Sequence, residues 1–177
     1  MSDSSPRDFD IRELFDALDA QRVSRGLSWR GVANEMWNLS AVLNTRRDDH
    51  PISPATLKGM AERRATSCQH ALFMLRWLGR TPESFLPGGA VNSKDTLPPA
   101  GSDRRLRWDL AGLYEALDGR RRERQLTWSE LARELRCSAN QLTGIRTARF
   151  AVEMNLAMKI VQWLRRPAAD FIYEAEW

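Results

Sequence analysis

An internal duplication constrains the fold of this 177-residue chain more than any other feature of its sequence. The matches include residues 9–11 (Phe-Asp-Ile) with 108–110 (Trp-Asp-Leu), residues 27–29 (Leu-Ser-Trp) with 126–128 (Leu-Thr-Trp), Leu57 with Leu142, and Trp77 with Trp163. The early matches lie 99 positions apart, and the late ones lie 85 or 86 positions apart. A period of this length is that of a whole domain rather than of a solenoid unit. We therefore expect one small fold to occur twice.

The fall in the offset places an insertion of 14 residues (99 − 85) in the first copy, at about positions 37–51. Apolar residues at Trp37, Val42 and Leu43 predict that the preceding helix continues for about two or three further turns. Residues 45–51 are polar and are expected to form an exposed loop.

Helical spacing of apolar residues runs through both copies, between residues that favour helix ends. Asp10 is a suitable N-cap for a first helix, which Gly26 would end. Ser53 followed by Pro54 predicts another helix start. The near-continuous apolar run at 71–78 predicts a buried helix, and residues 81–86 predict a short closing helix.

Residues 127–146 of the second copy predict two short helices joined by a tight turn. Thr127 with Glu130, and Ser138 with Gln141, have the spacing of capping boxes at the two helix starts. Leu131, Ala132 and Leu135 fall on one face of the first helix, and Leu142 and Ile145 on one face of the second. This leaves a polar face on the second helix.

These residues resemble the helix-turn-helix motif of the lambda-repressor-like (Cro/CI, XRE type) DNA-binding family. Ala132 stands at the small position of the first helix, Cys137 at the buried position of the turn, and Leu142 and Ile145 at core positions of the second helix. The resemblance implies that the second helix enters the DNA major groove with its N-terminal residues at the base edges. The alternative is a plain capped helical hairpin. The insertion in the first copy departs from the family pattern, because the turn between the two helices is normally short.

The resemblance also implies roles for individual residues. The candidate base-reading residues of the second copy are Asn140, Gln141, Thr143 and Ala139. The candidate contacts to the DNA backbone are Trp128, Arg146, Arg149, Arg63 and Arg64. Thr56, Lys58 and Ala55 stand at the base-reading positions of the first copy. Asn and Gln side chains can pair with adenine through two hydrogen bonds, and Ala or Thr methyl groups can contact thymine.

Composition restricts the function further. The net charge of +4 and a pI near 9.6 are compatible with binding to nucleic acid. Two Cys and two His cannot supply a disulfide framework or a four-ligand zinc site. No catalytic set, phosphate-binding Gly-rich loop or metal-spaced cluster is evident, so we expect no enzyme, no cofactor and no metal. No signal pattern or membrane-length apolar run is evident, so we expect a cytoplasmic chain with no membrane contact.

The expected fold is all-α, with two tandem lambda-repressor-like helix-turn-helix bundles joined by a Pro/Gly-rich linker. The first domain spans residues 8–87 with its insertion at about 37–51, the linker spans 88–103, and the second domain spans 104–177. The expected function is sequence-specific regulation of transcription through double-stranded DNA. The alternative is a helical protein-interaction module of the same fold that has lost DNA binding in one or both copies. It would hold a second copy of the chain or another protein through the insertion or the aromatic tail at 171–177.

Overall fold

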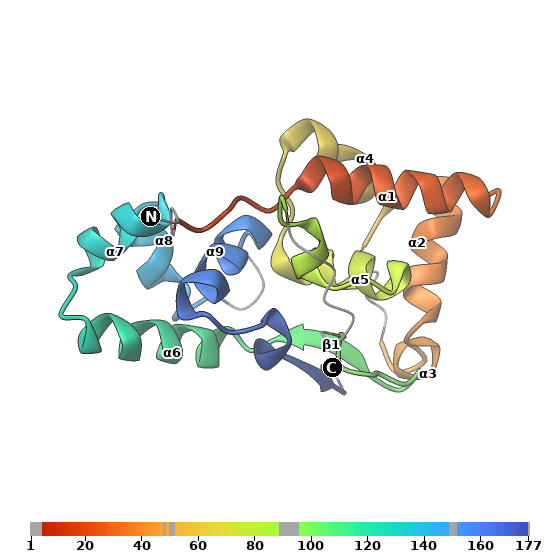
Figure 1. The fold of residues 1–177 in the computed structure, drawn as a ribbon. Helices are drawn as coiled ribbons and strands as arrows, with labels where there is room; N and C mark the ends of the chain where they lie inside the picture. Colours follow the sequence, from red (N-terminus) through yellow and green to blue (C-terminus); the bar gives the residue numbers. More distant parts are fainter. Residues whose placement is uncertain (1–4, 48, 50–51, 89–95, 149–151, 177) are drawn as a thin grey trace.

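The computed structural model describes residues 5–47, 49, 52–88, 96–148 and 152–176 (Figure 1). About 60% of the chain is helical. The first half contains α1 (Ile11–Ser24), α2 (Trp29–Asn38), α3 (Ala41–Asn44), α4 (Pro54–Arg63), α5 (Cys68–Leu78) and the 3-10 helix η1 (Pro82–Phe85). The second half contains β1 (Arg105–Trp108), α6 (Leu110–Glu123), α7 (Trp128–Leu135), α8 (Ala139–Gly144), α9 (Met154–Leu164), the 3-10 helix η2 (Ala168–Phe171) and β2 (Ile172–Ala175). We refer to α1 to η1 as the first repeat and to α6 to η2 as the second.

The starts of α1 and α4 and the end of α5 are where the sequence predicts them. The Asp10 carboxylate accepts a hydrogen bond from the Glu13 N–H at the start of α1. Ser53 caps α4 in the same way, with Pro54 as its first helical residue. Gly79 ends α5 in the left-handed region, at φ 66°, which a residue without a Cβ adopts readily.

The duplication extends to individual side-chain contacts. In each repeat a glutamate of the second helix accepts a hydrogen bond from a tryptophan indole and pairs with an arginine at the end of the first helix. The groups are Arg25, Glu35 and Trp77 in the first repeat and Arg124, Glu134 and Trp163 in the second. The indole Nε1 lies 2.8 Å from the carboxylate in the first repeat and 2.7 Å in the second. The two repeats therefore have matching internal packing.

A two-stranded antiparallel sheet departs from the expected all-α fold. β1 pairs with β2 in a register that places Arg105 opposite Ala175 and Trp108 opposite Ile172. The aromatic tail thus folds back on the chain, with Phe171 and Ile172 buried. The sequence prediction missed this sheet because each strand has only four residues, and its partner is more than 60 residues away along the chain (172 − 108).

The predicted extension of α2 into the insertion is wrong. The helix ends at Asn38, and the short α3 follows as a separate element. Side chains take the backbone acceptors that a longer helix would use: Arg76 Nη2 donates to the Leu39 carbonyl at 2.8 Å, and Asn44 Nδ2 donates to the Trp37 carbonyl. The chain bends at this point because these contacts replace the helical ones.

The insertion holds the segment that leads into the second repeat. The Leu43 N–H donates to the Ser102 carbonyl at 3.1 Å. The Arg105 side chain, only 2% exposed, donates to Asn44 Oδ1 at 2.9 Å and pairs with Asp49 at 3.1 Å. Hydrogen bonds from Arg47 and Arg105 keep the pKa of Asp49 well below its usual value. This part of the insertion therefore makes its contacts within the chain.

Each repeat extends a short segment onto the last long helix of the other repeat. We call residues 6–9 the first arm and residues 105–108 the second arm; they are equivalent positions, 99 apart. The first arm crosses from α1 to α9 (Figure 1), where Arg7 exchanges two hydrogen bonds with the Gln162 amide. The second arm lies on α5, where Trp108 Nε1 donates to the Cys68 carbonyl at 3.0 Å.

The repeats also meet through a reciprocal pair of backbone hydrogen bonds. The Cys68 N–H donates to the Val152 carbonyl at 2.8 Å, and the Met154 N–H donates to the Thr66 carbonyl at 2.9 Å. Cys68 is equivalent to Met154, and Thr66 to Val152, because each pair is 86 positions apart. A contact that is repeated when the two copies are exchanged is isologous, as at the two-fold axis of a homodimer. The chain is therefore packed as a dimer of its own repeats.

The ion pair between Asp8 of the first arm and Lys159 of α9 allows a test of the arm contact. The two groups are 2.9 Å apart, and the lysine side chain is 9% exposed. We expect Asp8→Asn to lower the free energy of unfolding by about 1 kcal/mol, because the buried ammonium loses its ionised partner while Asp8 itself is screened by solvent. In a Lys159→Met background the same change should have a smaller effect, because only the contacts of Asp8 with Asn155 and Arg136 remain. Urea unfolding of the four proteins measures this coupling.

The contribution of this ion pair to the stability of the fold should depend on pH. The hydrogen bond from Lys159 keeps the pKa of Asp8 below its usual value. The stabilisation is therefore present above the carboxyl pKa of the unfolded chain and is lost as the pH falls through the lower pKa of the folded chain. An Asp8→Asn effect that persists after Asp8 is protonated would contradict this assignment.

Candidate nucleic-acid interface

The α7–α8 pair has the tight turn that the sequence predicts. α7 buries Leu131, Ala132 and Leu135 and ends at Arg136 in the left-handed region, at φ 53°. Ser138 then caps α8, which buries Leu142 against the same core. Both predicted capping boxes are present, Thr127 with Glu130 and Ser138 with Gln141. The two helices are thus fixed by their caps and by a shared apolar contact.

The outer face of α8 consists of small polar side chains. Asn140, Gln141 and Thr143 are exposed, and Ala139 is half-buried. Arg146 follows the helix and is exposed as well. These residues form one continuous surface, whereas the predicted backbone contact Arg149 lies outside the described residues.

The three polar residues of α8 differ in the hydrogen bonds that their side chains already make within the chain. The Gln141 carbonyl oxygen accepts a hydrogen bond from the Ser138 N–H at 2.8 Å, so only its amide N–H groups remain for a ligand. The Thr143 hydroxyl donates to the Ala139 carbonyl at 3.2 Å. Within the described part of the chain, the Asn140 side chain has no hydrogen bond. Asn140 is therefore the residue best able to present both a donor and an acceptor.

The predicted backbone contact Trp128 is held within its own repeat. Its ring stacks on Tyr114 with centroids 5.7 Å apart, and the Arg121 guanidinium lies 4.5 Å from its ring centroid. Trp29 has the equivalent partners, Phe15 and Arg22, in the first repeat. The same aromatic and arginine partners therefore surround this tryptophan in both repeats, which shows that the residue contributes to packing within each repeat. Trp128 is also the first residue of α7.

The first repeat presents a different surface. α2 and α4 are separated by α3 and the rest of the insertion, so no tight turn joins them. Ala55 and Lys58 are exposed on α4, whereas the half-buried Thr56 hydroxyl lies 3.0 Å from Ser53 Oγ. A contact from α4 to DNA would therefore depend mainly on Lys58.

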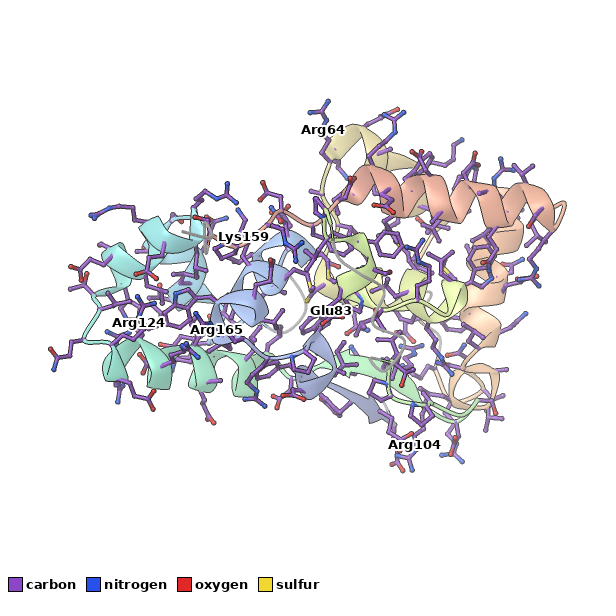
Figure 2. All side chains as sticks on the ribbon, in the orientation of Figure 1. Arg64, Glu83, Arg104, Arg124, Lys159 and Arg165 are labelled. Atoms are coloured by element: carbon purple, nitrogen blue, oxygen red, sulfur yellow. The ribbon has the colours of Figure 1, made fainter. Side chains whose placement is uncertain are left out.

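The two predicted arginines of the first repeat lie at the end of α4. Arg63 lies back along this helix, close enough to Gly59 that a Cβ there would be 2.6 Å from its Nη1. Arg64 is exposed and ends the helix in the left-handed region, at φ 50°. Arg64 is labelled at the end of α4 in Figure 2.

Arg136 is a residue at this surface that the sequence prediction missed. It lies at the turn before α8, is exposed, and donates a hydrogen bond to the Pro6 carbonyl of the first arm. This hydrogen bond brings the first arm to the turn that precedes α8. The spacing of the two capped helices indicates a turn here, which needs one residue in the left-handed region. The sequence did not mark Arg136 for this position, because glycine or asparagine usually occupies it.

Both cysteines are free thiols, with Cys68 buried and Cys137 half-buried in the turn. Burial raises the pKa of Cys68 to about 12, and it also raises the pKa of Cys137. A raised pKa disfavours the thiolate, which is the reactive form of a cysteine. The described residues contain no group of three His, Cys, Asp or Glu side chains placed to hold a metal ion.

Comparison with protein-family models, with curated proteins and with solved structures gave no match. Among the helices in the described part of the chain, none is long and apolar enough to cross a membrane.

Substitutions at Gln141 should separate its role in the cap from any role in binding. Gln141→Ala should lower the free energy of unfolding by about 0.5–1 kcal/mol, because the Ser138 N–H loses its partner. Gln141→Glu should keep full stability, because a carboxylate at this position completes the same capping box. Asn140→Ala should change stability by less than about 0.5 kcal/mol, since its side chain is exposed. Thermal or urea unfolding measures all three, and equal losses for Gln141→Ala and Gln141→Glu would contradict the capping role.

Proposed function

We propose that the chain is a sequence-specific DNA-binding regulator of transcription, built from two tandem helix-turn-helix repeats that resemble the lambda-repressor-like family. The observation that carries this proposal is the exposed polar face of α8. It follows a tight turn and presents Asn140, Gln141 and Thr143, with Arg146 beside them. Helix-turn-helix proteins place such a face in the major groove.

The chemistry of this surface fits double-stranded DNA. A free asparagine amide can donate to and accept from the edge of adenine. The exposed Arg146 can contact a phosphate, which fixes the position of the protein without reading sequence. Arg136 lies at the turn before α8 and can serve in the same way. The net charge of +4 is modest, so we expect affinity to depend on a few well-placed contacts.

The isologous packing of the repeats supports binding as a preassembled dimer. In a dimeric repressor two identical subunits read two identical half-sites. Here the two reading helices would be unlike: α8 has Asn140 and Gln141, whereas α4 has Ala55 and Lys58 at the equivalent surface. The proposal therefore predicts an asymmetric binding site, with most sequence information in the half that contacts α8.

The alternative of a protein-interaction module is less well supported. A protein partner would bind at the insertion or at the C-terminal tail. The described part of the insertion holds the second arm, and the tail forms β2, which leaves Val42 and Tyr173 as their exposed large apolar side chains. Most of both segments is therefore engaged within the chain.

Selection from a randomised duplex library, followed by sequencing, tests sequence recognition. The unmodified chain should enrich one motif, and Asn140→Ala should relax the preference at one base pair by about 1–3 kcal/mol of discrimination. Asn140→Ala leaves the cap of α8 intact, so its effect would not arise from unfolding. Failure of the unmodified chain to enrich any motif would contradict the proposal.

Arg146 should contribute to binding independently of sequence. We expect Arg146→Ala to weaken binding to all duplexes alike and to reduce the slope of log K against log salt by about 1. Arg122→Ala is the matched control, because Arg122 is an exposed arginine on α6 that pairs with Asp118. Fluorescence anisotropy over a range of salt concentrations measures both variants. A salt slope that Arg146→Ala and Arg122→Ala change equally would show that Arg146 is not a specific phosphate contact.

A further inference from the structure

A basic pocket lies in the second repeat, away from α8. It has a volume of about 610 Å3 and lies between the ends of α6 and α9, with one residue from α7. Its lining residues are Arg120, Arg124, Glu134, Gln162, Trp163 and Arg165. Arg124 and Arg165 are both labelled in Figure 2, on the part of the molecule where α6 and α9 approach each other. The volume is within the range of small-molecule sites.

The pocket carries more positive charge than its own carboxylate can balance. Glu134 pairs with Arg124 at 2.8 Å and also accepts the Trp163 indole hydrogen bond. Arg120 donates to the Leu164 carbonyl at 3.0 Å, and its guanidinium lies 5.5 Å from the Trp163 ring centroid. Among the described residues, neither Arg120 nor Arg165 has an ion pair with a carboxylate. Two guanidinium groups thus face the pocket without a counterion.

The first repeat shows which of these residues the fold requires. The equivalents of Arg124, Glu134 and Trp163 are Arg25, Glu35 and Trp77, and they make the same contacts. The equivalents of the two unbalanced arginines are instead Gln21 and Gly79. Gln21 Nε2 donates to the Trp77 carbonyl at the end of α5, so a neutral side chain serves there. Favourable interaction of arginine with a helix C-terminus therefore does not by itself explain the two additional arginines.

Arg165 ends α9 in the left-handed region at φ 57°, where the first repeat has Gly79 at φ 66°. Arg64 and Arg136 end α4 and α7 in the same region, so this backbone conformation is a common helix end in the chain and glycine can replace arginine there. The side chain of Arg165 lines the pocket.

We propose that this pocket binds a small free polyanion, such as a phosphorylated or polycarboxylated metabolite, held by Arg120 and Arg165. Guanidinium groups bind phosphate and carboxylate oxygens through paired hydrogen bonds. The Arg120 and Arg124 guanidinium groups lie 5.5 and 5.2 Å from the Trp163 ring centroid, so recognition of the anion rests on charged groups rather than on ring stacking. A free small anion fits better than a DNA phosphate because the pocket contains no residue of α8 or of the turn before it.

The bound anion would also adjoin the first arm. Gln162 lines the pocket and exchanges two hydrogen bonds with the Arg7 backbone. A neighbouring hollow formed by Ser5, Pro6, Glu134 and Trp163 shares two lining residues with the pocket. A ligand in this position would therefore stabilise the packed form of the arm.

The test titrates the full chain with sodium pyrophosphate, with inorganic phosphate and citrate as further probes and sodium chloride as the control at matched ionic strength. The readout is the NMR signal of the Trp163 indole N–H, assigned with Trp163→Phe. The equivalent indole of Trp77 is an internal control, because it has the same glutamate partner but Gln21 and Gly79 in place of Arg120 and Arg165. We expect the Trp163 signal to shift saturably with pyrophosphate while the Trp77 signal does not.

Substitution to the residues of the first repeat completes the test. Arg165→Gly and Arg120→Gln should each weaken pyrophosphate binding by about tenfold. Glycine suits the left-handed position, so Arg165→Gly should fold normally. Arg122→Gln is the control on the same helix and should leave binding unchanged. The titration contains no DNA, so its outcome is independent of the library selection.

Several results would overturn the proposal. They are a Trp163 signal that does not saturate, equal shifts at Trp163 and Trp77, or unchanged binding in the Arg120→Gln/Arg165→Gly double variant. Loss of duplex binding in the double variant, without pyrophosphate binding to the unmodified chain, would assign the pocket to nucleic acid and would also overturn the proposal of a small free anion.

Discussion

The structure depends above all on the reciprocal contact between the two repeats. Cys68 and Met154 donate to Val152 and Thr66 at equivalent positions, and α5 and α9 pack at the same interface. Two short arms add to it, each lying on the long helix of the other repeat. Because each arm must cross to the other repeat, neither repeat has its complete set of packing partners alone. The covalent link makes this contact intramolecular and therefore independent of protein concentration.

The duplication also serves as an internal control for interpreting side chains. Where both repeats keep the same contacts, as with the Arg-Glu-Trp groups and the stacked pairs at Trp29 and Trp128, the contacts belong to the fold. Where the repeats differ, the difference points to a particular role. The insertion holds the second arm, the polar face of α8 is the candidate reader, and Arg120 and Arg165 of the charged pocket stand where the first repeat has Gln21 and Gly79.

The sequence predicts the local structure well and the non-local structure poorly. Caps at Asp10, Ser53, Thr127 and Ser138 depend on residues three positions apart, so spacing alone is sufficient to find them. The sheet between β1 and β2 depends on two short segments far apart in the chain, and no local pattern distinguishes them from loops. The end of α2 depends on Arg76 from another helix.

The same distinction applies to the candidate site. The exposed face of α8 follows from helical spacing, and the sequence predicts it. That Gln141 is engaged in the cap while Asn140 is free depends on side-chain geometry, as does the approach of the first arm to Arg136. The basic pocket joins the ends of α6 and α9, more than 40 residues apart (165 − 120), so only the folded chain shows it.

Reciprocal contacts hold the repeats, and with them α4 and α8, in one fixed arrangement. Electron–electron double resonance measures whether this arrangement is fixed, with nitroxide labels on Lys58→Cys and Asn140→Cys in a chain that carries Cys137→Ala. Cys68 is buried with a raised pKa and should remain unlabelled. We expect one distance distribution as narrow as that of a pair within the first repeat, Arg12→Cys with Lys58→Cys. A distribution much broader than that reference would show that the repeats move independently and would contradict the account.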